Sequence, residues 1–326
     1  MNSDDILWVF CNENPGGIAS NIVNGILPAK KLGIRMIIFL NHFDPIKTLD
    51  KFKPKLIVLG KVIGNPSGVL SLIKEAKSRN IKVLIPLPDW NLSNEDDWNL
   101  QQNKIKLILA QNVDKVILQT KAASDYIKKN LNIESEIIPD CIRFTHNESI
   151  KKIREPLEIV WFGNSTNHDT LLDYGLLELY SSNLKLNLKV ITTFKDRILI
   201  NVDKKFLNRI NLNCIEWKPD MDKEVIKSDI VIIPYPNDKK RIVKTQNRIT
   251  DSMSMGRFVI TSDMPFTREF KDYCFIGDLG KGVAWVLENK PLAIKKAKLG
   301  KGYVDQNFSI LNISEMWRDL FVKYLK

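Results

Sequence analysis

The residues best suited to chemistry follow an apolar run, Asp229–Pro234, that is typical of a buried strand. Lys244, Asn247 and Arg248 stand close together where a helix is predicted to begin. Two cationic side chains, an amide and the positive end of a helix dipole can together bind a diphosphate. The alternative interpretation is a solvated basic loop that leads into a surface helix.

Two glycine-containing loops also follow predicted strands. Gly16 and Gly17 would let backbone amides approach an anion closely, although Pro-Gly-Gly is also ordinary turn chemistry. Gly163 and Asn164 could cradle a phosphate with backbone amides. His168 stands near the helix start that follows and is interpreted as a surface residue.

Two further loops could contact other parts of a ligand. Asp89 follows a buried strand and could orient a hydroxyl group or act as a base, or it could only cap its loop. Trp217, Lys218 and Pro219 could line a nucleobase pocket, or the tryptophan could lie at the edge of a core. The chain has only 3 histidines and no CxxC pair, so no metal site is predicted.

Short β-branched runs alternate with amphipathic segments along the whole chain, which predicts parallel sheets covered by helices on both faces. The first series of predicted strands is Ile6–Cys11, Ile34–Leu40, Leu56–Leu59, Lys82–Pro86, Lys115–Gln119 and Glu136–Pro139. The second series is Glu158–Gly163, Lys185–Thr192, Cys214–Trp217, Asp229–Pro234, Phe258–Thr261 and Cys274–Gly277. Helices are expected at 18–32, 67–79, 98–111, 121–131, 169–181, 204–210, 246–255, 281–288, 292–307 and 313–324.

The restart of the pattern after a charged stretch, Glu148–Pro156, predicts two α/β domains. We expect Rossmann-like domains at residues 1–150 and 151–310, facing each other across a cleft. The final helix, within residues 311–326, is expected to pack back on the first domain. In such sheets ligands bind beyond the carboxyl ends of the strands, which is where the loops above lie.

Composition narrows the class of protein. The 326 residues carry a net charge of +11, spread along the chain as lysine-rich pairs, and the aromatic interleaving of a nucleic-acid-binding surface is missing. The chain has neither a secretory signal nor an apolar run that could span a bilayer, so we expect a cytoplasmic protein, with peripheral contact to an anionic membrane left open. Its 4 scattered cysteines are expected to be small buried side chains.

The order of these motifs resembles the carboxyl-terminal half of GT-B glycosyltransferases. The resemblance covers Trp161–Phe270 and includes Trp-Phe-Gly, Trp-x-Pro, Asp-Ile-Val-Ile-Ile-Pro, Lys-Thr-x-Asn-Arg and Val-Ile-Thr-Ser. It is similar in particular to a bacterial subgroup with a Lys-Ser/Thr-x-Asn-Arg signature. The amino-terminal half matches only in architecture and in its Gly16-Gly17 loop.

The resemblance implies roles for the residues named above. The second domain would bind a nucleotide sugar, with Lys244, Asn247 and Arg248 at the phosphates or the sugar. The nucleobase would lie beside residues 217–219 and the diphosphate near residues 163–164, with Gly16 and Gly17 closing from the other domain. Asp89 would lie on the acceptor side, and no metal or other cofactor would be required.

One departure from the family pattern concerns two carboxylates of its larger retaining group. Asp251 takes the position of the second glutamate and could hold a ribose hydroxyl, or it could be a solvated helix residue. The first position holds Val243. The stereochemical outcome is therefore open.

The sequence supports three hypotheses. The first is a metal-independent glycosyltransferase that moves a sugar from a nucleotide diphosphate sugar to a hydroxyl of a surface glycan or lipid-linked acceptor. The second is a nucleotide-sugar epimerase. Such an enzyme usually needs histidine, so the small number of histidines disfavours this hypothesis. The third is a non-catalytic subunit that binds nucleotide sugars. A nucleic-acid partner is not expected, and the oligomeric state is not indicated.

Overall fold

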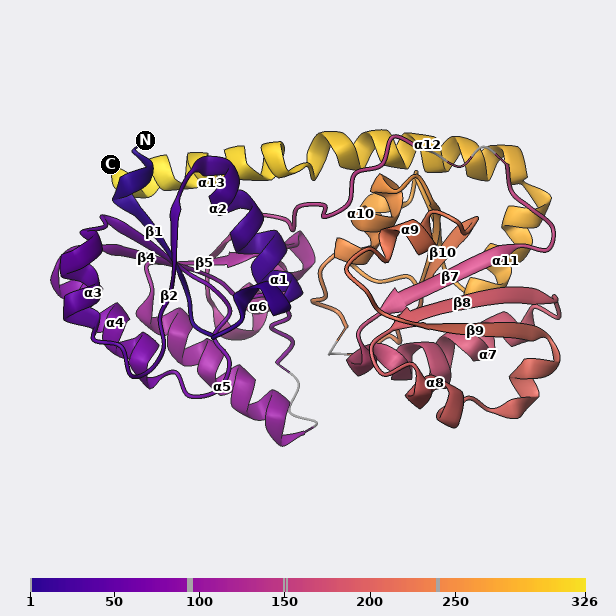
Figure 1. Cartoon of the computed structure of the whole chain (residues 1–326), viewed down its shortest axis with the longest axis horizontal. Coiled ribbons are helices and arrows are strands. Elements are labelled where there is room, and N and C mark those ends of the chain that lie inside the picture. Colours follow the sequence, from indigo (N-terminus) through magenta and orange to yellow (C-terminus); the bar gives the residue numbers. More distant parts are fainter. Residues whose placement is uncertain (1, 93–95, 149, 151, 239–240) are drawn as a thin grey trace. The chain divides into compact units, whose positions relative to one another are not determined.

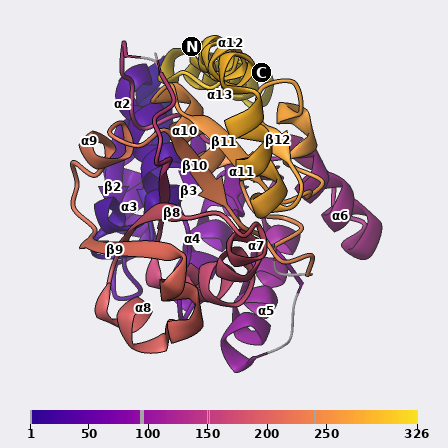
Figure 2. The same ribbon diagram turned by 90° about the vertical axis from the view of Figure 1, so that its right-hand side faces the viewer.

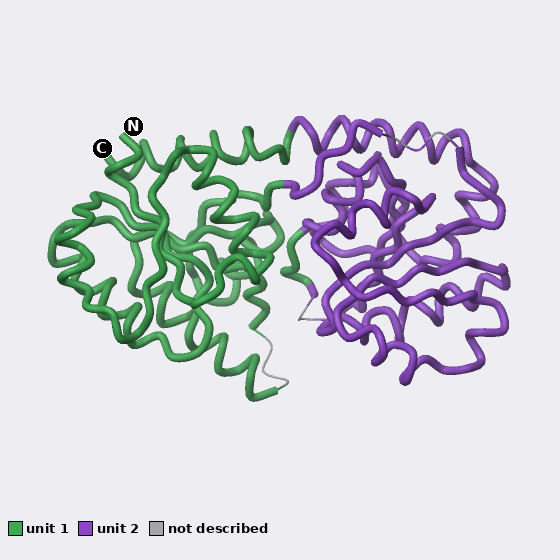
Figure 3. Tube along the Cα trace, in the orientation of Figure 1, with its two compact units in different colours: residues 1–141, 242–245, 307–326 green, residues 142–241, 246–306 purple. Residues whose placement is uncertain are grey.

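The chain divides into two compact units. The computed structural model describes residues 2–92, 96–148, 150, 152–238 and 241–326. Unit 1 consists of Met1–Cys141, Ile242–Thr245 and Asn307–Lys326, and unit 2 of Ile142–Arg241 and Gln246–Gln306 (Figure 3). Unit 1 is therefore assembled from three separate segments of the chain.

Unit 1 is built on a six-stranded parallel sheet with the order β2-β1-β3-β4-β5-β6 (Figure 1). Its strands are β1 (Ile6–Phe10), β2 (Arg35–Ile38), β3 (Leu56–Leu59), β4 (Lys82–Pro86), β5 (Lys115–Leu118) and β6 (Ser135–Ile137). Its helices are α1 (Ala19–Asn21), α2 (Leu27–Leu32), α3 (Pro45–Phe52), α4 (Ser67–Ser78), α5 (Asp97–Asn112), α6 (Lys121–Leu131) and α13 (Ile310–Leu325).

Alternate residues of these strands bury opposite faces of the sheet. On β1, Leu7 and Val9 join a cluster with α3, α4, α5 and α6, whereas Trp8 joins one with α2 and α13. Successive strand side chains point to opposite faces, so the continuous apolar runs of these strands require helices on both faces.

The last helix, α13, completes the second of these faces. The ring centroid of Trp317 lies 4.9 Å from that of Trp8, and Phe321 also packs on Trp8 edge to face. Both tryptophans are fully buried. Figures 1 and 2 show the two chain ends side by side, as both belong to unit 1.

Unit 2 has a second six-stranded parallel sheet, with the order β12-β11-β10-β7-β8-β9. Its strands are β7 (Glu158–Gly163), β8 (Leu186–Thr192), β9 (Ile210–Glu216), β10 (Ile230–Ile233), β11 (Phe258–Thr261) and β12 (Phe275–Ile276). Its helices are α7 (Leu176–Ser181), α8 (Asp196–Asn201), α9 (Asp222–Val225), α10 (Asn247–Ser254), α11 (Leu279–Glu288) and α12 (Lys290–Asn307). Strands and helices thus alternate as the sequence predicts.

Several local expectations differ from the structure. The helix expected at residues 204–210 is a 3-10 turn, Lys204–Asn208, and Ile210 already begins β9. The helix expected at residues 169–181 starts with a π-helical turn, Thr170–Gly175, before α7. The short helices α3, α8 and α9 were not predicted.

The division into units also differs in detail from the expected domain limits. Residues 142–150 group with unit 2, and Ile242–Thr245 group with unit 1, although they lie in the middle of the expected second domain. The expected linker, Glu148–Pro156, includes residues 149 and 151, which lie outside the described residues. No described helix is long and apolar enough to cross a membrane.

Candidate functional site

The sheet of unit 2 has a topological switch point between β7 and β10. From β7 the chain continues outward through β8 and β9, and it then returns to the other side of β7 to form β10, β11 and β12. The loops after β7 and β10 therefore leave the sheet in opposite directions, which opens a crevice at the carboxyl ends of these strands. Gly163 and Arg248 of the predicted phosphate site lie close together at this crevice.

Arg248, in the first turn of α10, lies at this switch point, and no described residue provides an anion for it. Its guanidinium carbon is 4.9 Å from the ring centroid of Tyr235, which follows β10. Its Nη1 is buried and has no hydrogen-bond acceptor among the described residues, which also contain no carboxylate paired with it. A buried donor atom without an acceptor is costly, so this arrangement favours an anionic ligand.

Arg241, from the same loop, shows the opposite situation. Its guanidinium binds Asp169 and also Asp238, with Nη1 2.5 Å from Asp238 Oδ2. These two carboxylates satisfy Arg241 within the protein. Arg248 is therefore the arginine of this loop that has hydrogen-bonding capacity left for a ligand.

Gly163 ends β7 directly beside this arginine. A Cβ atom at Gly163 would lie 3.1 Å from the Trp161 ring and 3.4 Å from Arg248 Nη1. The absence of a side chain thus leaves room for both neighbours. The next residue, Asn164, accepts a hydrogen bond from Thr166 N at 3.0 Å and caps a 3-10 turn, Ser165–Asn167.

His168 follows this turn and is nearly buried, not a surface residue as the sequence suggested. Its Nε2 lies 2.8 Å from Thr192 Oγ1, at the end of β8. Burial lowers the pKa of His168, Arg197 lowers it further, and Asp169 opposes both. His168 is thus a neutral side chain near neutral pH that connects the loop after β7 with the end of β8.

Trp217, Lys218 and Pro219 follow β9, which is the edge strand of this sheet. All three residues are exposed, and 39% of the Trp217 surface is accessible. The Trp217 amide donates to Thr192 O at 2.9 Å, which ties this segment to the end of β8. The aromatic face is available to a planar ligand group, and its predicted contact with a nucleobase stays a prediction.

Asp251, by contrast, has its partner inside the protein. It is fully buried, and it accepts hydrogen bonds from Arg143 N at 2.9 Å, Nε at 2.8 Å and Nη2 at 2.7 Å. Both carboxylate oxygens are used in this way. This placement does not favour the predicted contact of Asp251 with a ribose, and the residue is not part of the site proposed below.

Lys244 belongs to unit 1, although Asn247 and Arg248 of the same motif belong to unit 2. Its Nζ lies 3.4 Å from Oδ1 of Asp89, the residue expected on the acceptor side. The preceding Val243 is buried in the hydrophobic cluster of unit 1. A carboxylate at this position would have to be buried among apolar side chains at a high cost, so the valine suits its place in this cluster.

Asp89 is surrounded by lysines. The Nζ of Lys106, on α5, donates to the carbonyls of Pro88 at 3.0 Å and Asp89 at 2.9 Å, and so holds the loop after β4. Burial alone would raise the pKa of the Asp89 carboxyl, but Lys244, Lys61 and Lys106 outweigh it and hold that pKa below its usual value. Asp89 is therefore ionised at neutral pH and can accept a hydrogen bond from a hydroxyl group.

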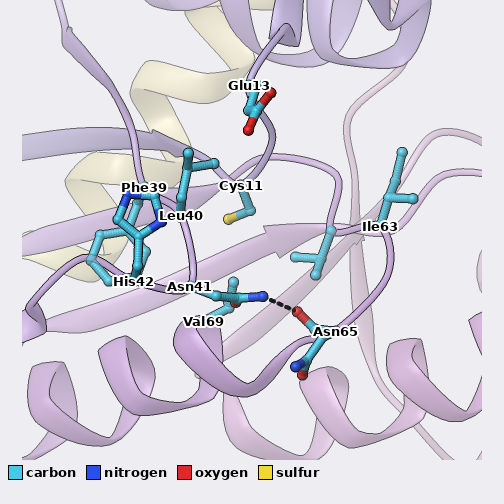
Figure 4. Close-up of a pocket in the computed structure, with 10 residues that line it drawn as sticks. Cys11, Glu13, Phe39, Leu40, Asn41, His42, Ile63, Asn65 and Val69 are labelled. Atoms are coloured by element: carbon cyan, nitrogen blue, oxygen red, sulfur yellow. Dashed lines mark hydrogen bonds between the residues drawn. The ribbon is translucent and has the colours of Figure 1, made fainter.

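A cavity of about 240 Å³ opens at the carboxyl ends of the first three strands of unit 1. Figure 4 shows Cys11 and Glu13 on one side of it and Asn41 and Asn65 on the other, with Asn41 Nδ2 donating to Asn65 O at 3.1 Å. Burial raises the pKa of Cys11 to about 12, so its thiol stays protonated. The cavity offers neutral hydrogen-bonding groups and one exposed carboxylate.

Gly16 and Gly17 form a short 3-10 turn, Pro15–Gly17, in the loop after β1. The Gly17 amide donates to the carbonyl and the side-chain oxygen of Asn14, both at 3.1 Å. This amide is therefore used within the turn. The predicted closing contact of these glycines with a donor stays a prediction.

Three residues near the carboxyl edges of the two sheets were not predicted from the sequence. Tyr235 and Lys61 stand one or two residues after strands, so the rule applied to the other loops would have found them. Lys106 lies inside a helix, where no such signal exists. Among the described residues, no group of three histidine, cysteine, aspartate or glutamate side chains could hold a metal ion.

No family model and no curated protein matches the chain, but solved structures do. WaaG, described as a glycosyltransferase involved in lipopolysaccharide biosynthesis, is 12% identical with a TM-score of 0.64, covering 97% of this chain and 99% of its own. TarM is 16% identical with a TM-score of 0.63 over 85% of this chain. This match covers 57% of the TarM chain, so the chain spans little more than half of that protein.

Two further structures carry nucleotides. TarM from S. aureus has been solved with UDP bound. The UDP-GlcNAc 2-epimerase from Neisseria meningitidis, solved with UDP-GlcNAc, is 12% identical with a TM-score of 0.51 over 98% of this chain and 99% of its own. At such identities the likeness shows the fold. The chain has the two-domain α/β fold of GT-B glycosyltransferases, as its sequence predicts.

Proposed function

We propose that this chain transfers a sugar from a nucleotide diphosphate sugar to a hydroxyl group of an acceptor. The observation that carries the proposal is the buried Nη1 of Arg248 at the switch point of unit 2, for which the described residues provide no hydrogen-bond acceptor. The fold shared with glycosyltransferases supports the same reaction class.

The chemistry follows from where charge develops. As the bond between the sugar and the diphosphate breaks, negative charge grows on the leaving diphosphate. Arg248 is held against Tyr235 before the ligand arrives, so it can stabilise this charge with little reorganisation. In this proposal the arginine provides the positive charge, and the transfer requires no metal ion.

Unit 1 would supply the acceptor side of the reaction. Asp89 is ionised and half-exposed, so it can orient the acceptor hydroxyl and accept its hydrogen bond as the new glycosidic bond forms. The cavity nearby would hold neutral parts of the acceptor. A glycan or a lipid-linked precursor at a membrane surface fits this role.

The test is binding of nucleoside diphosphates to the full chain, followed by thermal unfolding with UDP, GDP, ADP and dTDP. We expect one of them to raise the unfolding midpoint of the wild type. In Arg248→Gln the affinity for it should fall at least tenfold, because a hydrogen bond to a charged group contributes about 1.5–3 kcal/mol.

Arg209→Gln is the matched control. Arg209 also lies over a tyrosine, 4.8 Å from the Tyr180 ring centroid, but at the amino end of β9 and with acceptors at Tyr180 O and Asn183 Oδ1. Its loss should leave nucleotide affinity unchanged. If no nucleoside diphosphate stabilises the wild type, the donor site is wrongly assigned.

Product analysis separates the related functions. A new glycosidic bond on an added acceptor supports the transferase. Formation of an epimeric nucleotide sugar without any acceptor would identify an epimerase instead. Binding with neither product would identify a nucleotide-sugar-binding subunit.

A further inference from the structure

Three lysines at the carboxyl edge of unit 1 share a single carboxylate, that of Asp89. Lys244 Nζ lies 3.4 Å from Asp89 Oδ1, and Lys106 Nζ donates to the Asp89 carbonyl at 2.9 Å. Lys61 also interacts electrostatically with Asp89. Among the described residues, no second carboxylate is paired with any of these three lysines. The cluster therefore has an excess of two positive charges when all its members are ionised.

The cluster is built into the sheet and is not a set of flexible surface lysines. Lys61 follows β3, and its carbonyl accepts from Asn12 Nδ2 at 3.3 Å, while its amide donates to Asn21 Oδ1 at 2.9 Å. Lys106 is only 8% exposed and is held by two carbonyls. The backbone of one lysine and the side chain of another are thus fixed by hydrogen bonds.

Lys61 also lies at the switch point of this sheet. From β1 the chain forms β2 on one side, and it then returns to form β3 on the other side of β1. The loops after β1 and β3 separate there, and the Asn12 contact to Lys61 joins them across the crevice. The next residues, Val62 and Ile63, line the cavity of unit 1.

The excess positive charge makes the ammonium groups of the cluster repel one another. Burial lowers the pKa of Lys106 to about 7, and Lys61 and Lys244 add to this effect, against the attraction of Asp89. An anion among the three ammonium groups would relieve this repulsion and restore the charge of Lys106. A phosphate group, with up to two negative charges and several acceptor oxygens, matches the excess.

We propose that Lys61, Lys106 and Lys244 bind a phosphate group of the acceptor in unit 1. This inference rests on the proposed function, because only a transferase has an acceptor. It specifies that the acceptor is a phosphorylated compound. The phosphate would lie at the lysines, and the rest of the acceptor would extend past Asp89 or into the cavity.

The first experiment measures binding of inorganic phosphate to the full chain by titration calorimetry, against chloride at equal ionic strength. We expect phosphate to bind the wild type and to bind Lys61→Gln roughly tenfold more weakly or worse, because one charge-assisted contact is lost. Lys61→Arg keeps the charge and should retain binding, which separates loss of charge from misfolding.

Lys82→Gln is the matched control. Lys82 begins β4, at the opposite edge of the same sheet, and its Nζ lies 3.3 Å from Asp114 Oδ1. Phosphate affinity should be unchanged in this variant. Equal affinity of wild type and Lys61→Gln, or no binding beyond that of chloride, would overturn the proposal.

Nucleoside diphosphate binding, measured in the same variants, shows whether the lysines bind a phosphate of the donor or of the acceptor. UDP affinity should depend on Arg248 and not on Lys61. If Lys61→Gln weakens UDP as much as phosphate, the group belongs to the donor and the proposal is wrong. If UDP does not bind at all while phosphate does, the donor site fails and the anion site stands.

The last arm compares two carriers of the same group. Glycerol 3-phosphate represents a soluble phosphorylated acceptor, and vesicles of phosphatidylcholine with phosphatidic acid represent a lipid-linked one. Lys61-dependent binding of either supports the proposal and identifies the carrier. Binding of neither contradicts it.

Discussion

The two units carry parallel sheets of equal size, but positive charge is arranged differently at their carboxyl edges. In unit 2 the guanidinium of Arg248 lies over an aromatic ring and has no carboxylate partner in the described part of the chain, while nearby Arg241 has two. In unit 1 three lysines share one carboxylate, Asp89. The edge of unit 2 offers a hydrogen-bond donor with a fixed direction. The edge of unit 1 offers a region of excess positive charge.

This difference suggests a division of labour. A planar guanidinium binds a phosphate with defined geometry, which suits a leaving group that must be held in line for transfer. Ammonium groups bind as point charges and tolerate several ligand orientations. Unit 1 is therefore suited to anchoring a substrate whose reacting hydroxyl is placed by another residue, Asp89.

The largest expected effect concerns Asp251, whose carboxylate is buried and bound by Arg143. Asp251→Asn leaves Arg143 buried without its counter-charge, which should reduce the free energy of unfolding by about 3–5 kcal/mol. Urea unfolding measures this loss. Asp263→Asn, which breaks an exposed pair with Arg268, should cost less than about 1 kcal/mol. A small loss of stability with a large loss of UDP affinity would instead assign Asp251 to the ligand.

The next prediction concerns the excess positive charge of unit 1 and its effect on the free energy of unfolding at different pH values. Below pH 7 Lys106 is charged in both the folded and the unfolded chain, so its burial penalty is fully present. Between about pH 7 and its unfolded pKa of 10.5, the folded chain releases this proton while the unfolded chain keeps it, so stability should rise with pH.

Urea unfolding at pH 7, 8 and 9 measures this slope, and Lys106→Met should reduce it. Asp89, Lys61 and Lys244 face Lys106 and remain in the variant. Lys104→Met, on an exposed position of the same helix, should keep the wild-type slope. Parallel curves for wild type and Lys106→Met would show that the lysine is not the origin of the pH dependence.

A smaller effect is expected from crowding the edge of unit 2. The methyl group of Gly163→Ala would press on the Trp161 ring and approach Arg248, at an expected cost of about 1–3 kcal/mol in stability. Nucleotide affinity should fall several-fold as the guanidinium shifts. Gly302→Ala, in a helix with open space at the Cβ position, should not destabilise the chain. Calorimetry with UDP compares both variants, and wild-type affinity in Gly163→Ala would contradict the placement of Arg248.

The smallest effect concerns the edge strand β9. Trp217→Ala should leave stability unchanged, because the side chain is exposed, and should weaken UDP by about 1 kcal/mol if the indole stacks on the base. Trp98→Ala, an exposed tryptophan of unit 1, is the control. Comparing UDP with pyrophosphate measures the contribution of the base. An equal loss for both ligands would exclude stacking.

The strands and the strand-end loops were predictable because they depend on local patterns. Apolar β-branched runs such as Ile230–Ile233 identify a buried strand, and the residues that follow it lie at the ligand edge. In this way the sequence predicts a phosphate-binding role for Arg248. Nothing local indicates that Asp251 is bound by Arg143, which lies 108 residues earlier.

The lysine cluster was not predictable for the same reason. Lys106 lies in a helix whose residues alternate irregularly between polar and apolar, so its inward direction follows from the packing of α5 on β4. Val243 was interpreted as a missing glutamate, whereas its own role is to fill the core of unit 1. These assignments depend on contacts between segments far apart in the chain.

The segmented construction of unit 1 has a consequence for the order of folding during synthesis. The face of its sheet that contains Trp8 is covered by Trp317 and Phe321, which follow the whole of unit 2 in the chain. Unit 2 ends at Gln306, so it can complete its core while the first unit still exposes part of its own. A released chain truncated after this residue should therefore contain a protease-resistant second unit and a protease-sensitive first one.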